Sequence, residues 1–424
     1  MIGTFFLKLR HIFQDETLRN RVLFVVVALL IFRVLAAIPI PGVDATRLES
    51  FFANNQFLGL LDIFSGGGLS GLSIVALGVG PYITASIIMQ LLTVLVPKLK
   101  QLYQEEGDAG RARFSQYSRY LTVPLAILQA FALIMFLRQN GVITDLTNME
   151  FLTNVLVIAS GSILLMWIGE LITEFGVGNG VSLIIFAGIV AALPSMISQL
   201  VFAFDVTQVP LYLGFIAAAI AITAAVVFIS EAERPVPVTY SRRVRGMKVF
   251  GGISTYLPLR VNQAGVMPII FALSILLFPQ VIANFLAASG IPGVSGAAQS
   301  VAAALNSGWV YGPLYFFLVV LFTYFYTAIT FEPTTIAKNL QQSGAFIPGV
   351  RPGETTANYI GNIITRITLV GSLFLGFIAV LPIIMQGITG IATLTIGGTA
   401  LLIAVSVVLD LVKKIDAQLS IREY

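Results

Sequence analysis

The longest uncharged stretch of the chain runs over residues 261–331 and reads VNQAGVMPIIFALSILLFPQVIANFLAASGIPGVSGAAQSVAAALNSGWVYGPLYFFLVVLFTYFYTAITF. These 71 residues far exceed the roughly 20 apolar residues that one transmembrane helix needs. Turn-forming residues at 290–296 divide the stretch into two helices. A second uncharged stretch, residues 367–409, is divided in the same way by glycines at 387–390. Both stretches therefore predict pairs of membrane-spanning helices.

The composition of the whole chain agrees with a membrane protein. Of its 424 residues, 57% are hydrophobic and 10% are charged, whereas an ordinary soluble domain has about 25% charged residues. This excludes a soluble enzyme, a disordered protein and the usual kind of nucleic-acid-binding domain. The chain has no cysteine and a single histidine, His11, which excludes disulfides, thiol chemistry and buried histidine sites.

Apolar runs between charges predict an all-α polytopic membrane protein with ten transmembrane helices. Arg33 is the only charge deep in a span, where we expect it to cap backbone carbonyls or to pack at the interface. The expected spans are residues 22–40, 74–97, 119–138, 152–174, 180–202, 210–231, 264–286, 310–332, 365–386 and 389–411.

The basic residues fix the expected orientation. If the N-terminus is cytoplasmic, 21 of the 24 lysines and arginines fall in cytoplasmic segments. Cytoplasmic loops of membrane proteins carry such an excess. We therefore expect both termini in the cytoplasm.

Ten spans divide into two halves of five, residues 1–202 and 203–424. An odd number of spans in each half forces the halves into opposite orientations, so a repeat must be inverted. Residues 78–83 resemble 265–270, and 180–185 resemble 398–403, at corresponding places in the halves. Apolar helices also produce such short matches by chance, but their joint position favours the repeat.

The glycine-interrupted segments of these repeats carry no ionisable group. Val79 and Ile83 are four residues apart and share a helix face, as do Val181 and Ile185. The pattern predicts a ring of aliphatic side chains near the membrane midplane, with ordinary helix packing as the alternative. Ion-coupled transporters need acids, histidines or amides there, and these are sparse. An aliphatic ring therefore favours a pathway that can seal around many different solutes. The alternatives are a transporter of a neutral solute and a lipid-handling scaffold.

Residues 57–70 are mostly apolar, too short to cross a bilayer, and rich in glycine at their end. They predict either a half-helix folded back into the protein or an amphipathic helix at the interface.

Neutral polar residues are sparse in the spans, and such groups join helices by hydrogen bonds of about 0.6–2 kcal/mol. They include Thr84, Gln90, Gln129, Asn262 and Gln263.

Two cytoplasmic loops, residues 232–262 and 333–364, are too long for simple connectors. In the first, alternating Val236, Val238 and Tyr240 precede a basic tip and Val249 follows it, which predicts a hairpin. In the second, Pro-Gly pairs on both sides of Arg351 fix its backbone and present its side chain. Such loops suit docking on anionic lipid, an acidic protein or RNA. The positive-inside effect alone explains their charge but not their length or rigid turns.

Four motifs in the predicted order resemble the SecY family, the channel subunits of the bacterial protein translocase. They are LGVGPYITASII at residues 77–88, GNGVSLI at 178–184, RVNQAGVMPII at 260–270 and SGAFIPGVRPGE at 343–354. The resemblance covers essentially the whole chain. It implies two five-helix halves around an hourglass pore, with a hinge between the fifth and sixth spans.

The resemblance also implies roles for individual residues. Residues 57–70 would be the plug of the pore. The constriction ring would be Val79, Ile83, Val181, Ile185, Ile270 and Ile403. The lateral gate would carry Thr84, Gln129 and Asn262. The sites for a motor or ribosome would be Arg242, Arg243, Arg245, Lys248 and Arg351.

The function implied is a protein-conducting channel in the bacterial plasma membrane, without catalysis or a cofactor. It would move secretory polypeptides across the membrane and membrane proteins laterally into it. The partners implied are SecE, SecG, the motor SecA, the ribosome with its RNA, polypeptides that carry a signal sequence, and the lipid bilayer. The sequence contains no phosphate-binding loop of Walker type, so a partner must hydrolyse the nucleotide.

Overall fold

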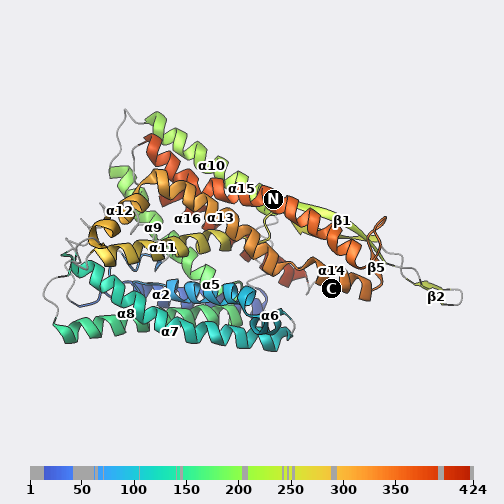
Figure 1. Ribbon diagram of the computed structural model, residues 1–424, viewed down its shortest axis with the longest axis horizontal. Coiled ribbons are helices and arrows are strands. Elements are labelled where there is room, and N and C mark those ends of the chain that lie inside the picture. Colours follow the sequence, from blue (N-terminus) through green and yellow to red (C-terminus); the bar gives the residue numbers. More distant parts are fainter. Residues whose placement is uncertain are drawn as a thin grey trace. The chain divides into compact units, whose positions relative to one another are not determined.

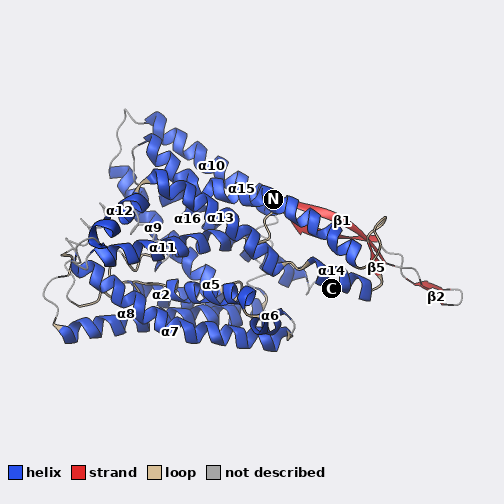
Figure 2. Cartoon of the chain, in the orientation of Figure 1, coloured by secondary structure: helices blue, strands red, loops and turns tan. Residues whose placement is uncertain are grey.

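The fold is a set of long helices joined by loops, two of which carry short β-strands (Figures 1 and 2). It comes from a computed structural model of the full chain. The structure describes residues 14–41, 62, 65–69, 71–104, 106–139, 141–143, 147–202, 209–240, 243–245, 248–250, 254–287, 294–389 and 396–420.

The chain forms two compact units. Unit 1 contains residues 1–207, 277–306 and 407–424, and unit 2 contains residues 208–276 and 307–406. The boundary at 207 lies close to the predicted division between the halves at 202. The helices α11 (Met267–Ala287) and α16 (Ile396–Ser420) contribute residues to both units. The division into inverted halves stays a prediction.

Unit 1 is built on packed helices that begin at well-defined caps. The carboxylate of Asp15 accepts hydrogen bonds from two backbone amides at the start of α2, and Thr147 with Glu150 forms a capping box at the start of α8. The helices of this unit are α2 (Glu16–Ala36), α5 (Gly80–Leu95), α6 (Pro97–Gln104), α7 (Gly107–Gln139), α8 (Asn148–Phe175), α9 (Gly180–Phe202) and α12 (Val294–Asn306).

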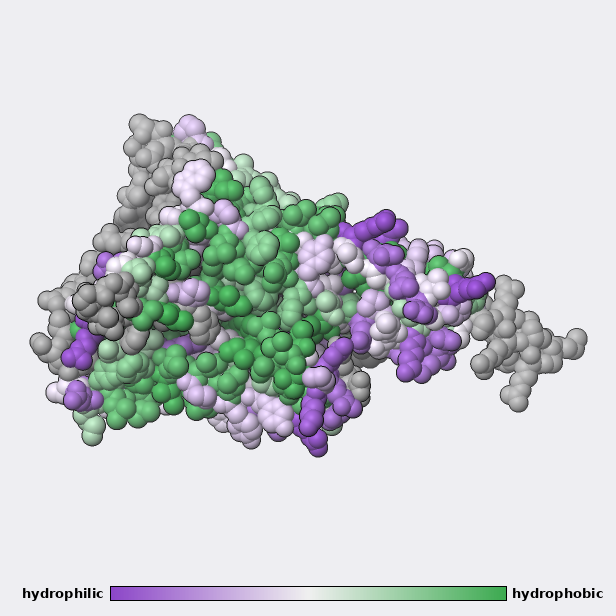
Figure 3. All heavy atoms as spheres, in the orientation of Figure 1, coloured by the Kyte–Doolittle hydropathy of each residue, from purple (hydrophilic) through white to green (hydrophobic). Residues whose placement is uncertain are grey.

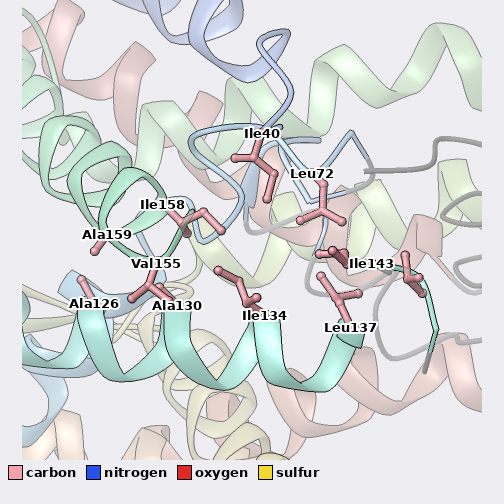
Figure 4. Close-up of a cluster of buried hydrophobic side chains, with 11 residues drawn as sticks. Ile40, Leu72, Ala126, Ala130, Ile134, Leu137, Ile143, Val155, Ile158 and Ala159 are labelled. Carbon is pink, nitrogen blue, oxygen red and sulfur yellow. The ribbon is translucent and has the colours of Figure 1, made fainter. Parts of the chain in front are cut away.

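A hydrophobic core of unit 1 lies between α7 and α8. Ala126, Ala130 and Ile134 of α7 face Val155 and Ile158 of α8, and all five side chains are buried (Figure 4). Small residues on α7 let the two helices approach closely, which is the usual way that helices associate in membranes. Ile40 and Leu72 cover the end of this cluster (Figure 4).

Unit 2 contains the two cytoplasmic loops and the helices that carry them. Helix α13 packs along α15, where Gly376 of α15 lies against the ring of Phe316. The helices are α10 (Val209–Glu231), α13 (Gly308–Thr330), α14 (Pro333–Gln342) and α15 (Glu354–Thr389). The strands are β1 (Glu233–Tyr240), β2 (Arg243–Arg245), β3 (Lys248–Phe250), β4 (Ser254–Arg260) and β5 (Ala345–Phe346).

The predicted hairpin in the first loop is confirmed. Strand β1 pairs with β4 in antiparallel register from Glu233↔Arg260 to Thr239↔Ser254, and β2 pairs with β3 nearer the tip. Val236 and Val238 are buried, as their alternation predicts. On the face shown in Figure 3, hydrophilic side chains gather at the end of this unit that carries β1 and α14.

Each of the ten predicted spans overlaps a helix that the structure describes. Among the described residues, four helices are long and apolar enough to cross a membrane, or five if α5 and α6 form one span bent by 115°. The chain is therefore a polytopic membrane protein whose spans are helical, and the number ten stays a prediction.

The helix ends differ from the hydropathy pattern. Helices α7 and α15 begin at Gly107 and Glu354, about three turns before the predicted spans. Backbone hydrogen bonds continue a helix through polar sequence, so hydropathy marks where a span enters the membrane and not where its helix ends. The helices α12 and α14, in loops, were not expected either.

Candidate functional site

The start of α5 places two of the predicted ring residues, Val79 and Ile83. The backbone of Gly78 adopts a positive φ of 55° just before the helix, a conformation that glycine adopts readily. The hydroxyl of Ser162 on α8 donates a hydrogen bond of 2.8 Å to the carbonyl oxygen of Gly78. Next to it, Gly161 lies directly on the carbonyl of Ile74. These contacts fix the helix start, and both Val79 and Ile83 are buried.

The start of α9 places the other two ring residues of unit 1. Gly180 lies against the carbonyl of Gly169 on α8, so that the two backbones touch. Ile185 is buried and Val181 is half-buried. Unit 1 therefore holds four aliphatic side chains at two glycine-rich helix starts, both of which are supported by α8.

The remaining ring residues, Ile270 on α11 and Ile403 on α16, belong to unit 2, and both are buried. The ring as a whole includes residues from both units and stays a prediction, as does the hourglass pore.

The predicted plug segment is described in part. Residues 57–61, 63–64 and 70 lie outside the described residues, whereas Asp62 and residues 65–69 are described. We call residues 65–69 the anchor segment. The backbone N–H of Leu69 donates to the Asp62 carboxylate over 3.0 Å and to the Ser65 hydroxyl over 2.9 Å, which closes a tight local turn. Leu69 is buried, so this end of the segment is folded into unit 1.

Two helices hold the anchor segment. The backbone of Gly66 touches the backbone of Gly188 on α9 and the ring of Phe32 on α2. The guanidinium of Arg33 donates a hydrogen bond of 3.0 Å from Nη1 to the carbonyl oxygen of Gly66. Of the two roles expected for Arg33, capping a carbonyl is the one observed.

The predicted gate residues come from three different segments of the chain. Thr84 on α5 is buried, and Gln129 on the neighbouring helix α7 is half-buried. Asn262 lies in unit 2 just before α11, and its buried Oδ1 has no hydrogen-bond partner among the described residues. The same holds for Gln90 Oε1 and for both amide atoms of Gln263. The gate that would combine Thr84, Gln129 and Asn262 stays a prediction.

The predicted docking residues lie in the two loops of unit 2. Arg242 is outside the described residues, Arg243 and Arg245 are in β2, and Lys248 in β3 pairs with Arg245 across the tip. In the other loop, the Arg351 side chain is exposed. The hydroxyl of Thr356 donates a 2.8 Å hydrogen bond to the backbone carbonyl of Arg351, a contact that holds this backbone and that the Pro-Gly pattern did not predict.

Sequence reasoning missed three contacts. The pairing of β5 with β1 joins the two loops, and Gly188 supports the anchor segment. The third is an ion pair between Arg119 of α7 and Glu170 of α8, with Nε 2.5 Å from Oε1. Two-residue strands and single glycine contacts have no sequence pattern, and the two charged residues of the ion pair are distant in sequence.

The chain is similar over its whole length to curated protein translocase subunits SecY. It is 41% identical to the subunit of Mycobacterium tuberculosis strain H37Rv, covering 100% of this chain and 99% of the relative. It is 42% identical to that of Vibrio cholerae serotype O1, covering 96% and 93%.

Solved structures share the fold. One described as a protein-conducting channel superimposes with a TM-score of 0.66 at 19% identity, covering 95% of this chain and 93% of the other. The Sec61 chain of a canine ribosome–channel complex gives a TM-score of 0.63 at 18% identity, with the same coverage. A sequence model named SecY matches residues 73–412. Together with the full-length relatives, this match shows that the chain belongs to the SecY family.

Proposed function

We propose that this chain is the channel-forming subunit of a protein translocase in the bacterial plasma membrane, with both termini in the cytoplasm. It moves secretory polypeptides across the membrane and membrane proteins laterally into it. The observation that carries the proposal is the similarity to protein translocase subunits over the full length of the chain. A transporter of a neutral solute finds no support in these comparisons.

The pore mechanism that we propose is passive. The ring of Val79, Ile83, Val181, Ile185, Ile270 and Ile403 offers an extended polypeptide only weak apolar contact, so it does not select a sequence. Four of these side chains are held at helix starts fixed by α8, which supports a ring of defined position. When empty, an aliphatic constriction excludes water and ions.

Residues 57–70 act as the plug in this proposal. The anchor segment, which is the described end of the plug, is held by the hydrogen bond from Arg33 and by the backbone contact with Gly188. These two contacts favour the folded-back arrangement over an interfacial helix, because both bring the chain inside unit 1.

The energy for translocation comes from partners. We propose that SecE and SecG complete the membrane complex, and that SecA or the ribosome docks on the basic loops. The solved structures that share the fold include Sec61 in a canine ribosome–channel complex and an Ssh1 complex bound to the yeast 80S ribosome. The tip residues Arg242, Arg243, Arg245 and Lys248 and the exposed Arg351 supply positive charge for an acidic protein or for ribosomal RNA.

The lateral gate carries Thr84, Gln129 and Asn262 in this proposal. We expect Asn262→Leu to raise the stringency for signal sequences. The buried Oδ1 of Asn262 has no partner among the described residues, and an unsatisfied buried polar atom costs about 1–3 kcal/mol. Leucine removes this cost and stabilises the closed seam. Export of proteins with weakened signals should therefore fall by about fivefold or more, measured in reconstituted vesicles. Unchanged export of these proteins at normal complex assembly would count against a gate role.

The proposed function is tested by purifying the chain with its small subunits and reconstituting it into vesicles. A polypeptide with a signal sequence should become protected from protease when motor and ATP are added, and a matched polypeptide without the signal should not. Saturable uptake of a small neutral solute without polypeptide transport would instead establish the transporter.

A further inference from the structure

The two docking loops share one sheet. Strand β5 of the second loop pairs with the end of β1 in the first, through Thr239↔Phe346 and Tyr240↔Ala345. The strand order is β4-β1-β5, and we call this three-stranded sheet the root sheet (Figure 1). All three strands lie within unit 2. The loops are therefore connected by backbone pairing, although they are far apart in the sequence.

A cluster of buried hydrophobic side chains packs the root sheet against α15. Ile347, directly after β5, is 2% exposed, and Val236 and Val238 of β1 are each 1% exposed. Members of this cluster come from both loops and from the first turns of α15. The cluster consists of Val236, Val238, Leu259, Ala345, Ile347, Ile360, Ile363 and Ile364.

The hairpin is also fixed where it leaves the sheet. The N–H of Val261 donates a hydrogen bond of 2.9 Å to the carbonyl of Ala232, which closes the base of the hairpin. The carbonyl oxygen of Val261 lies so close to Gly371 of α15 that a Cβ there would be 2.5 Å from it. Helix α15 therefore supports both the hairpin base and the second loop.

Arg351 follows the sheet by only a few residues. The N–H of Val350 donates a hydrogen bond of 3.1 Å to the carbonyl of Ile347. The Thr356 hydroxyl donates a hydrogen bond of 2.8 Å to the carbonyl of Arg351. Thr356 itself is 2% exposed. The Arg351 backbone is thus held from one side by the sheet and from the other by the start of α15, while its side chain is exposed.

We infer that β5, Ile347 and Thr356 position Arg351 relative to the hairpin, so that both loops meet a partner as one preformed docking surface. This inference rests on the proposed function of the loops. A partner that contacts both loops then binds without first ordering them, and such preorganisation raises affinity. Thr356 is a positioning residue, because it acts on the partner only through Arg351.

The test is a double-mutant cycle with purified bacterial ribosomes as the probe and the complete membrane complex in detergent. Thr356→Val removes the hydroxyl at nearly constant shape and should weaken ribosome binding by roughly two- to tenfold, the range for one lost hydrogen bond. In an Arg351→Ala background the same substitution should have no further effect. The control Thr365→Val removes a hydroxyl that donates within α15, to the carbonyl of Gly361, and the complex that carries it should bind ribosomes normally.

The outcomes separate the inference from the proposed function. If Arg351→Ala alone leaves binding unchanged, the docking role of the loop fails. If Arg351→Ala weakens binding but Thr356→Val does not, or if the two effects simply add, the positioning role is overturned.

A second measurement tests the strand pairing directly. The chain has no cysteine, so Thr239→Cys with Phe346→Cys introduces a single possible bridge between the loops. Oxidation should link the two cysteines and leave ribosome binding intact. Failure to form the bridge in the intact complex, or loss of ribosome binding once it forms, would contradict the inference that the two loops form one docking surface.

Discussion

Gly188→Ala should make the resting channel leak ions. The added Cβ would occupy the space of the Gly66 backbone, which lies directly against Gly188. Backbone cannot rotate away as a side chain can, so the anchor segment must shift. Overpacking of this kind costs about 1–3 kcal/mol, which raises the population of the released segment by about fivefold to a hundredfold. Single-channel recording in planar bilayers, without a translocating polypeptide, measures the leak.

Two further variants sharpen this prediction. Arg33→Gln removes the guanidinium that donates a hydrogen bond to the Gly66 carbonyl, so it should also increase the resting ion leak. Gly214→Ala on α10 is the control, because a Cβ there meets no described atom within 4 Å. Tight closure of the Gly188→Ala channel would show that the anchor segment does not hold the plug.

Arg351→Glu should abolish most motor-driven export and leave the membrane complex assembled. The side chain is exposed, so the substitution does not disturb packing. The backbone bond from Thr356 does not depend on the side chain of residue 351. Truncation of an arginine that dominates an interface costs about 2 kcal/mol or more, and charge reversal adds repulsion, so export should fall at least about thirtyfold. Protease protection of a preprotein in reconstituted vesicles measures it.

Lys338→Glu on α14 is the matched control for Arg351→Glu. It makes the same charge change at another exposed position of the same loop. If only the net charge of the loop matters, both variants will lose export equally. Normal export by the Arg351→Glu complex would remove the specific docking role of Arg351.

The helical part of the fold was predictable because long apolar runs are separated by charges. Every predicted span overlaps a described helix, and the alternation of Val236 with Val238 correctly predicted the hairpin. The starts of α7 and α15 were not predictable from hydropathy, since their first turns are polar and lie outside the apolar spans.

The site was predictable only in part. Glycines near helix starts indicated α5 and α9 as special segments. Gly180 lies against the carbonyl of Gly169 on α8, and Gly78 adopts a positive φ just before α5. The pairing of β5 with β1 was invisible, because two residues carry no alternation and their partner strand is distant in sequence. Likewise, the contact between Gly66 and Gly188 gives no pattern beyond the presence of two glycines.

Site-specific crosslinking tests the proposed polypeptide path through the aliphatic ring most directly. The absence of native cysteine allows single cysteines at Ile83 and Ile270, with Ile220 of α10, 65% exposed, as the outward-facing control. A secretory polypeptide stalled during export and carrying one cysteine-reactive group should link to positions 83 and 270 and not to 220. Crosslinks at 220 with none at 83 or 270 would contradict the path.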